Sequence, residues 1–102
     1  MAAHKRGRVM NSETKVSINR LAKALLKNMG KKPREIISYP SINSVLELRQ
    51  GSTSSLISYV ITSLEASGYT IERMGAGERG EDLGQCLTAK GRRMSAQMRG
   101  ER

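Results

Sequence analysis

A cluster of hydroxyl side chains in the middle of the chain is the group best placed to do chemistry. Four hydroxyl residues stand in a row and two more follow within the next helical turn: Ser52, Thr53, Ser54, Ser55, Ser58 and Tyr59. Hydroxyls at the start of a helix accept hydrogen bonds from free backbone N–H groups, and exposed hydroxyls bond phosphates or base edges. Taken alone, the cluster reads more simply as a helix cap followed by solvated surface. Its role therefore depends on the elements around it.

The sequence offers little for other kinds of chemistry. His4 is the single histidine and Cys86 the single cysteine, so neither an internal disulfide nor a zinc site is expected. No carboxylate pair, nucleophile–base pair or phosphate-binding loop stands out. We therefore expect no enzyme activity, no metal and no cofactor. We interpret Cys86 as a small core residue rather than a redox sensor.

Charge is the strongest feature of the composition. The 102 residues contain 18 Lys or Arg against 9 Asp or Glu, a net charge of +9, while aromatic residues make up only 3%. The excess is concentrated in residues 15–40, which hold seven Lys or Arg and one Glu. Such a chain is expected to bind a polyanion, either nucleic acid or an anionic membrane surface. Since no apolar run approaches the roughly 20 residues of a membrane span and no signal peptide is recognisable, we predict a cytoplasmic protein, nucleoid-associated if prokaryotic.

Hydrophobic periodicity predicts one domain that follows a basic arm. Residues 1–14 are small, polar and basic and are expected to form a flexible arm, which leaves residues 15–102 as a single domain. Apolar residues then recur at helical spacing up to Met29, where a glycine ends the predicted first helix of residues 15–29. Residues 34–39 fit a short strand or a helical turn equally well.

Two further helices follow, separated by a tight turn. Ser41, after Pro40, is the predicted N-cap of a short second helix that ends near Gly51. Beyond the hydroxyl cluster, a stripe of apolar residues at helical spacing predicts a third helix. The stripe consists of Ile57, Val60, Ile61 and Leu64. Two helices joined in this way form a helix-turn-helix.

After the third helix the pattern changes to that of a β-hairpin. Residues 69–74 and 85–88 favour strands, and a glycine-rich, charged loop separates them. Thr88 is the predicted N-cap of a last helix, with Met94 and Met98 on one of its faces. The predicted fold class is therefore α+β. It is a winged helix-turn-helix with a three-helix core, a β-hairpin wing and a short C-terminal helix.

Two short motifs carry a resemblance to a known family. Residues 63–73, Ser-Leu-Glu-Ala-Ser-Gly-Tyr-Thr-Ile-Glu-Arg, resemble the exit from the recognition helix in MarR-type regulators. Residues 87–93, Leu-Thr-Ala-Lys-Gly-Arg-Arg, resemble the segment that closes the wing of these regulators. The resemblance covers roughly residues 41–93, and it departs from the MarR pattern at Gly51 and in the absence of long terminal helices. In size, the chain is also similar to the TubR-type partition adaptors.

The resemblance implies a set of DNA-binding residues. The third helix would place the hydroxyl cluster in the major groove, and Arg79, between Gly77 and Gly80, would enter the minor groove from the wing. The backbone phosphates would be contacted by Lys31, Lys32, Arg34 and Arg49. Because the third helix carries no Lys or Arg, we expect modest base specificity or readout of DNA shape.

The leading hypothesis is a double-stranded DNA-binding transcriptional regulator that acts as a homodimer. Its interface is expected to include Met94 and Met98. A plasmid or phage centromere-binding partition adaptor and an RNA-binding winged-helix module are the alternatives, although the few aromatic residues count against RNA. A protein–protein adaptor is a further alternative, because the third helix has no basic residue. No membrane partner and no small-molecule substrate are expected.

Overall fold

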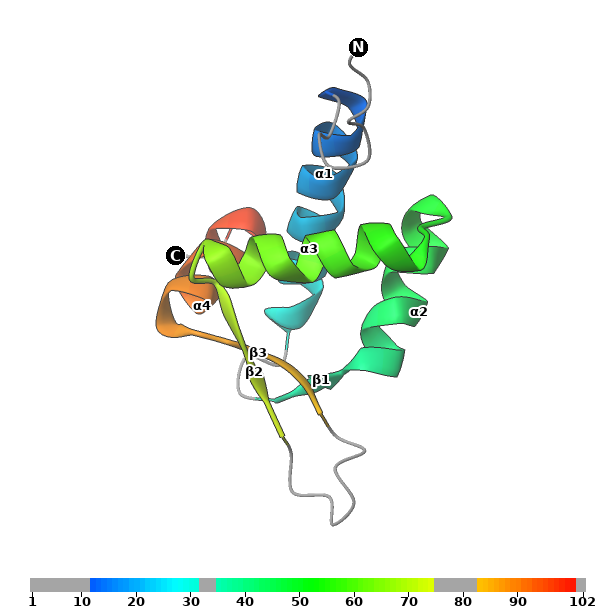
Figure 1. The fold of residues 1–102 in the computed structure, drawn as a ribbon. Helices are drawn as coiled ribbons and strands as arrows, with labels where there is room; N and C mark the ends of the chain where they lie inside the picture. The colour runs from blue at the N-terminus through cyan, green and yellow to red at the C-terminus, as the bar shows by residue number, and fades with distance from the viewer. Residues whose placement is uncertain (1–11, 32–34, 75–82, 101–102) are drawn as a thin grey trace.

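A computed structural model of the chain describes residues 12–31, 35–74 and 83–100, which form four helices and three strands (Figure 1). In chain order these are α1 (Ser12–Met29), β1 (Ile37–Ser38), α2 (Tyr39–Gln50), α3 (Ser54–Ala66), β2 (Thr70–Arg73), β3 (Gly84–Leu87) and α4 (Ala89–Met98). In Figure 1, α3 crosses the front of the molecule, with α1 behind it, α2 on the right, α4 on the left and the strands below. This is the arrangement of the winged helix-turn-helix that the sequence predicts.

The core is built around α1. Its apolar stripe is buried, and Leu21 and Leu25 are completely shielded from solvent. Side chains of α2, α3 and β3 close over this stripe, so the helical periodicity of each segment produces one apolar cluster. The buried apolar residues are Ile18, Leu21, Ala22, Leu25, Leu26, Met29, Ile42, Leu46, Ile57, Val60, Leu64 and Leu87. The stripe predicted for the third helix is therefore confirmed at three positions, whereas Ile61 is only half-buried.

The turn between α2 and α3 depends on Gly51. This residue has a φ of 62°, and its N–H donates to a carbonyl in the last turn of α2. Glycine is the residue that adopts this left-handed conformation most easily. The Ser52 hydroxyl then donates to the Leu46 carbonyl at 3.0 Å, and Thr53 Oγ1 accepts the N–H of Leu56 at 3.2 Å. The predicted capping of the third helix by the hydroxyl cluster is thereby confirmed, with Thr53 as the N-cap.

The start of α2 differs from the prediction. The sequence predicts Ser41 as the N-cap, but α2 begins at Tyr39 with Ser38 in the N-cap position, and Pro40 lies within the first turn. Proline fits there because its fixed φ suits a helix and the first-turn N–H groups need no intrahelical partner. Residues 37–38 form β1, so the ambiguous segment is a short strand followed directly by a helix.

The three strands form an antiparallel sheet in the order β1-β3-β2 (Figure 1). Thr70 pairs with Leu87 and Arg73 pairs with Gly84, which makes β2 and β3 the two arms of a hairpin. The strands of the predicted wing are therefore confirmed. The loop between them, residues 75–82, lies outside the described residues.

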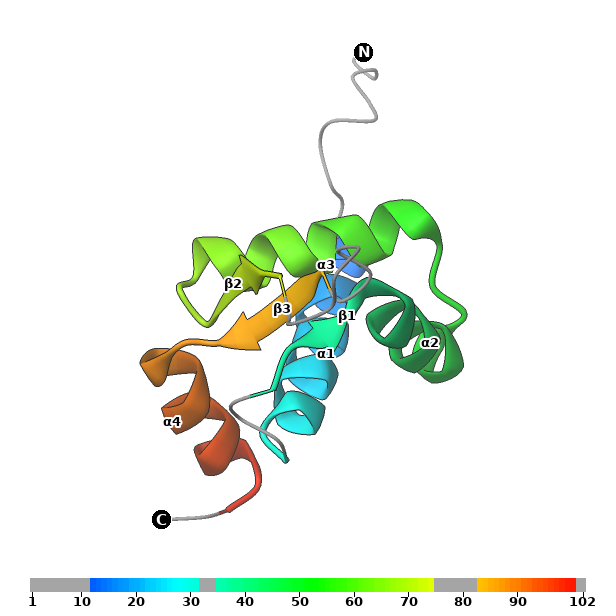
Figure 2. The same cartoon turned by 90° about the horizontal axis from the view of Figure 1, so that it is seen from below.

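The two ends of the domain pack together through α1 and α4, as Figure 2 shows from below. Ser95 of α4 is completely buried, and its hydroxyl donates to the Leu26 carbonyl of α1 at 2.8 Å. Thr88 is the N-cap of α4, as predicted, because its Oγ1 accepts the N–H of Gly91 at 3.0 Å. The last helix is therefore part of the domain core and not a loose extension.

The first helix begins earlier than predicted. The sequence predicts it over residues 15–29, whereas α1 begins at Ser12, within the predicted arm of residues 1–14. The rest of the arm, residues 1–11, lies outside the described residues, so its flexibility stays a prediction.

Candidate nucleic-acid interface

The outward side of α3 presents most of the hydroxyl cluster. Ser54, Ser55 and Ser58 are exposed, and Tyr59 keeps 43% of its surface accessible. Because the apolar stripe of α3 is buried on the other side, these four residues face away from the core, and we call them the α3 hydroxyl face. Thr62 is also exposed, one turn beyond Ser58. Thr62 was not among the predicted residues, although its spacing of four residues from Ser58 was the available signal.

The first two members of the cluster make hydrogen bonds within the chain. Ser52 is half-buried with its hydroxyl bound to the end of α2, and Thr53 is exposed but caps α3. Each therefore stabilises the helix-turn-helix directly. The four residues of the α3 hydroxyl face remain as the outward-facing part of the predicted set.

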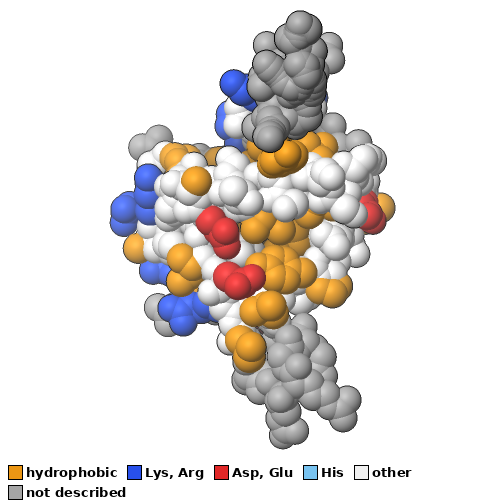
Figure 3. Space-filling view, in the orientation of Figure 1, with side chains coloured by type: hydrophobic (Ala, Val, Ile, Leu, Met, Phe, Trp, Pro, Cys, Tyr) orange, Lys and Arg blue, Asp and Glu red, His pale blue; other side chains and the backbone are white. Residues whose placement is uncertain are grey.

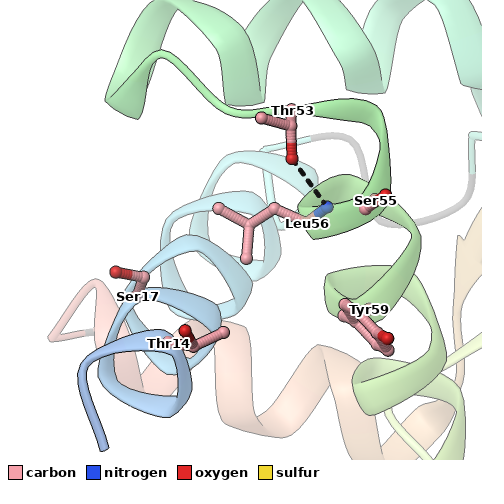
Figure 4. Close-up of a pocket in the computed structure, with 6 residues that line it drawn as sticks. All are labelled: Thr14, Ser17, Thr53, Ser55, Leu56 and Tyr59. Atoms are coloured by element: carbon pink, nitrogen blue, oxygen red, sulfur yellow. Dashed lines mark hydrogen bonds between the residues drawn. The ribbon is translucent and has the colours of Figure 1, made fainter. Parts of the chain in front are cut away.

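A shallow groove runs between α3 and the start of α1 (Figure 4). It has a volume of about 390 Å³ and is lined by Thr14 and Ser17 from α1 and by Ser55 and Tyr59 from α3. Figure 4 shows the two α1 residues on one side of the groove and the two α3 residues on the other. Hydroxyls on both walls suit hydrogen bonds to phosphate oxygens or base edges.

A polar network joins α3 to the hairpin. Gln85 of β3 is completely buried, where its Oε1 accepts the Thr70 hydroxyl at 2.5 Å and its Nε2 donates to Glu65 Oε2 at 2.8 Å. The same Nε2 donates to the Tyr39 hydroxyl at 3.1 Å, and that hydroxyl donates to the Glu72 carboxylate. Burying an amide without hydrogen-bond partners costs free energy. Moving the hairpin away from α3 would break these bonds, so they stabilise the position of the hairpin against α3.

The network includes two carboxylates that lie on the same face of the molecule as α3. Glu65 on α3 and Glu72 on β2 are both exposed. Figure 3 shows acidic side chains near the middle of this face and basic side chains at its left edge, over α4. Burial, followed by the hydrogen bond to Glu72, raises the pKa of the Tyr39 phenol. The face therefore combines hydroxyl groups with local negative charge, and α3 itself has no Lys or Arg.

The predicted phosphate-contacting residues are not gathered in one place. Arg49 is exposed in the last turn of α2, immediately before the turn that leads to α3. Lys31 is exposed just after α1, and the C-terminal ends of α1 and α2 lie apart in both views (Figures 1 and 2). Lys32 and Arg34 lie outside the described residues. Of the two described residues, Arg49 is the one close to the start of α3.

The two strands of the wing are described, but the residues proposed to contact DNA belong to the loop between them. Gly77, Arg79 and Gly80 fall outside the described residues, so their role stays a prediction. Arg73 and Met74, at the described end of β2, are both exposed. The part of the wing nearest the loop is therefore open to a partner.

Cys86 is not the core residue that the sequence predicts. It is half-buried and pairs with Ile71, which is itself 40% exposed. Strand alternation places Gln85 and Leu87 on the core face, and both are buried there. Cysteine is often a core residue, but the alternation of side chains along β3 places Cys86 on the opposite face from Gln85 and Leu87.

Met94 and Met98, the predicted dimer contacts, are half-buried and pack against the core of their own chain. They lie on α4, which covers part of α1. Some of the apolar surface that the sequence assigns to a dimer is therefore used within the domain.

Within the ranges 12–31, 35–74 and 83–100, no group of three His, Cys, Asp or Glu could hold a metal ion. None of the helices in these ranges is both long enough and apolar enough to cross a bilayer.

Comparisons with known proteins bear on the fold. No protein-family model matches the chain, and no curated protein matches it. A solved structure titled "Crystal structure of SSV1 F-93" is similar, with a TM-score of 0.58, 19% sequence identity and 82% of each chain covered. At this identity the likeness concerns the fold alone. It confirms the α+β winged helix-turn-helix class and does not extend to the MarR-type or TubR-type resemblance.

Proposed function

We propose that this protein binds double-stranded DNA by inserting α3 into the major groove. The observation that carries the proposal is the α3 hydroxyl face, which is exposed on the second helix of a helix-turn-helix. In such motifs this helix contacts base edges through its N-terminal residues. The net charge of +9 adds a long-range attraction to phosphates.

Hydroxyl groups would contact the bases in place of arginine. Serine hydroxyls bond several kinds of base edge and discriminate less than a bidentate arginine does. Glu65 and Glu72 repel phosphates, and Glu65 lies near the C-terminal end of α3. This charge favours an approach in which the first turn of α3 lies deepest in the groove. We therefore propose modest base specificity, assisted by readout of DNA shape.

Basic residues outside α3 would fix the orientation of the protein on the duplex. Arg49, in the last turn of α2, would contact a phosphate beside the start of α3. Arg79, with Gly77 and Gly80 beside it, would enter the minor groove. Lys32 and Arg34 would add further phosphate contacts.

The biological role that we propose is transcriptional regulation in the cytoplasm by a homodimer that binds two half-sites. One short helix and one wing bury little surface, so two copies would be needed for tight and specific binding. A partition adaptor would use the same contacts on a longer array of sites. The number of copies bound to duplexes with two sites or with many sites distinguishes these roles.

The decisive experiment selects preferred sequences from a random duplex library and then compares variants on them. Alanine at all four residues of the α3 hydroxyl face is expected to weaken binding to a selected site roughly tenfold or more, because several hydrogen bonds are lost. Binding to random duplex should change little. The control is Ser44→Ala with Gln97→Ala, which removes exposed polar groups from α2 and α4. Equal losses on selected and random DNA, or tighter binding to an RNA competitor, would contradict the proposal.

A further inference from the structure

A row of basic side chains follows the solvent side of α1. Arg20, Lys23 and Lys27 are all exposed and are separated by three and four residues. Lys31 continues the same spacing in the turn that follows the helix and is also exposed. Residues three and four apart lie on one face of a helix, so Arg20, Lys23 and Lys27 form a single strip on α1. Lys31 follows just past the end of the helix, and we call these four residues the α1 basic row.

The α1 basic row lies on the side of α1 that faces away from α3. The α1 residues that line the grooves shared with α3 include Thr14, Ser17 and Ile18. At 3.6 residues per turn, the centre of the row is about half a turn from these residues. Figures 1 and 2 show α1 behind and beneath α3, respectively. A straight duplex in contact with the α3 hydroxyl face would therefore not reach the row.

The charge of the row is not neutralised within the described part of the chain. None of Arg20, Lys23, Lys27 and Lys31 forms an ion pair with a described residue. Like charges three and four residues apart destabilise a helix, so the row weakens the isolated fold. An external polyanion would reverse this effect.

We propose that the α1 basic row is a second, sequence-independent binding surface for the phosphate backbone of double-stranded DNA. The row offers one positive charge about every 4.5–6 Å along the helix axis. Duplex DNA presents one negative charge about every 1.7 Å of its axis, so each cation can find a phosphate. Among the described side chains of α1, Val16 is the one large apolar group that is exposed, at 51%. A helix that lies on a membrane needs a broad apolar face, which favours DNA over a lipid surface.

Two DNA-binding surfaces on opposite sides of one domain would hold two duplex segments together. The α3 hydroxyl face would bind one segment, and the α1 basic row would bind a neighbouring one. This consequence rests partly on the proposed function, but the row itself needs no preferred sequence. Random duplex therefore tests the row independently of the α3 hydroxyl face.

The first experiment measures capture of a fluorescent random duplex by protein already bound to a biotinylated duplex. The test variant is R20Q/K23Q/K27Q, and the charge-keeping control is R20K/K23R/K27R. Capture is expected to fall at least tenfold in the test variant and to persist in the control. A second control, R92Q/R93Q, removes two exposed charges from α4, outside both proposed surfaces, and should keep capture. Equal capture by the test variant and the unmodified protein, or no capture by the unmodified protein, overturns the proposal.

The second experiment measures the salt dependence of binding to random duplex. The slope of log affinity against log salt should become shallower by about 2–3 in the test variant, because each phosphate contact contributes about 0.9. The thermal midpoint should stay equal or rise, since repulsion along α1 is relieved. Binding by the row that prefers duplex RNA or anionic phospholipid vesicles would overturn the choice of DNA. Variants of the α3 hydroxyl face could leave all DNA binding unchanged while R20Q/K23Q/K27Q abolishes DNA binding. The proposed function would then be wrong, and the proposal for the α1 basic row would stand.

Discussion

Gln85 and Glu65 are joined at the base of the wing, where Nε2 of the buried amide lies 2.8 Å from Oε2 of the carboxylate. Glu65 belongs to α3 and Gln85 to β3. The bond therefore ties the helix proposed to enter the major groove to the hairpin proposed to flank it. Because the amide is completely buried, the angle between these elements depends on polar partners as well as on apolar packing.

Replacing Gln85 by methionine is expected to lower the free energy of unfolding by roughly 1–3 kcal/mol. Methionine fills a similar volume but leaves the Thr70 hydroxyl without its acceptor and removes the hydrogen bond to Glu65. Urea unfolding followed by circular dichroism measures the change. Gln97→Met, at an exposed position of α4, is the matched control and should stay within about 0.5 kcal/mol. Equal effects of the two substitutions would show that the network adds little stability.

Replacing Glu65 by glutamine is expected to strengthen binding to random duplex about two- to fivefold. The substitution keeps an acceptor for Gln85 and removes a negative charge beside the α3 hydroxyl face. Glu47→Gln removes an exposed charge from α2 and serves as the control. Fluorescence anisotropy in low and high salt measures both variants. If Glu65→Gln leaves affinity unchanged at low salt, this end of α3 does not approach the duplex.

Tyr39 should make the stability of the fold sensitive to alkaline pH. Burial and the hydrogen bond to Glu72 raise the pKa of its phenol above the ordinary value of about 10, so the folded state binds this proton more tightly than the unfolded state does. The resulting stability is complete below pH 10 and is lost as the pH rises through the higher value in the folded state. The stability gap between the unmodified protein and Tyr39→Phe should therefore shrink above pH 10. Tyr59→Phe, at an exposed tyrosine, is the matched control and should change the free energy of unfolding by less than about 0.5 kcal/mol.

The sequence predicted the helices and the hairpin well because each has a clear hydrophobic period. The buried positions of α3 follow the stripe of Ile57, Val60 and Leu64. The start of α2 was predicted wrongly, because Ser41 after Pro40 looks like a cap. In the structure the proline itself occupies the first turn. A local signal of this kind allows several helix starts, and only the pairing of β1 with β3 selects one of them.

The candidate site was predictable only in part. The exposed serines and Tyr59 follow from the helical period, since they lie opposite the apolar stripe. The Gln85 network was not predicted, because its partners are 15, 20 and 46 residues away in the chain. One signal was present, since strand alternation places Gln85 on the same face as Leu87. The partners of a buried polar residue, however, depend on tertiary packing.

Replacing Gly91 by alanine is expected to destabilise the fold by roughly 1–3 kcal/mol. A Cβ at this position would overlap the backbone carbonyl oxygen of Tyr69, which also accepts the N–H of Thr88 at 3.0 Å. Backbone atoms cannot move aside as a flexible side chain can, so α4 would have to shift away from the hairpin. Thermal unfolding measures the loss, with Gln97→Ala on the same helix as the control. An unchanged midpoint for Gly91→Ala would mean that α4 is held less closely than the contact implies.

Glutamate at both Met94 and Met98 is expected to destabilise the domain as well as to disrupt any dimer. Both methionines pack against the core, so each glutamate would place a charge in a half-buried apolar setting, at a cost of roughly 1–3 kcal/mol per residue. Gln97→Glu introduces the same charge at an exposed position of α4 and should leave the fold intact. Circular dichroism must therefore accompany sedimentation, because loss of association has meaning only for a folded variant. If the double variant keeps the thermal midpoint of the unmodified protein and sediments as a monomer while the unmodified protein sediments as a dimer, the two methionines serve the dimer more than the core. If the unmodified protein is itself a monomer at micromolar concentration, both free and on DNA, the proposed homodimer is ruled out.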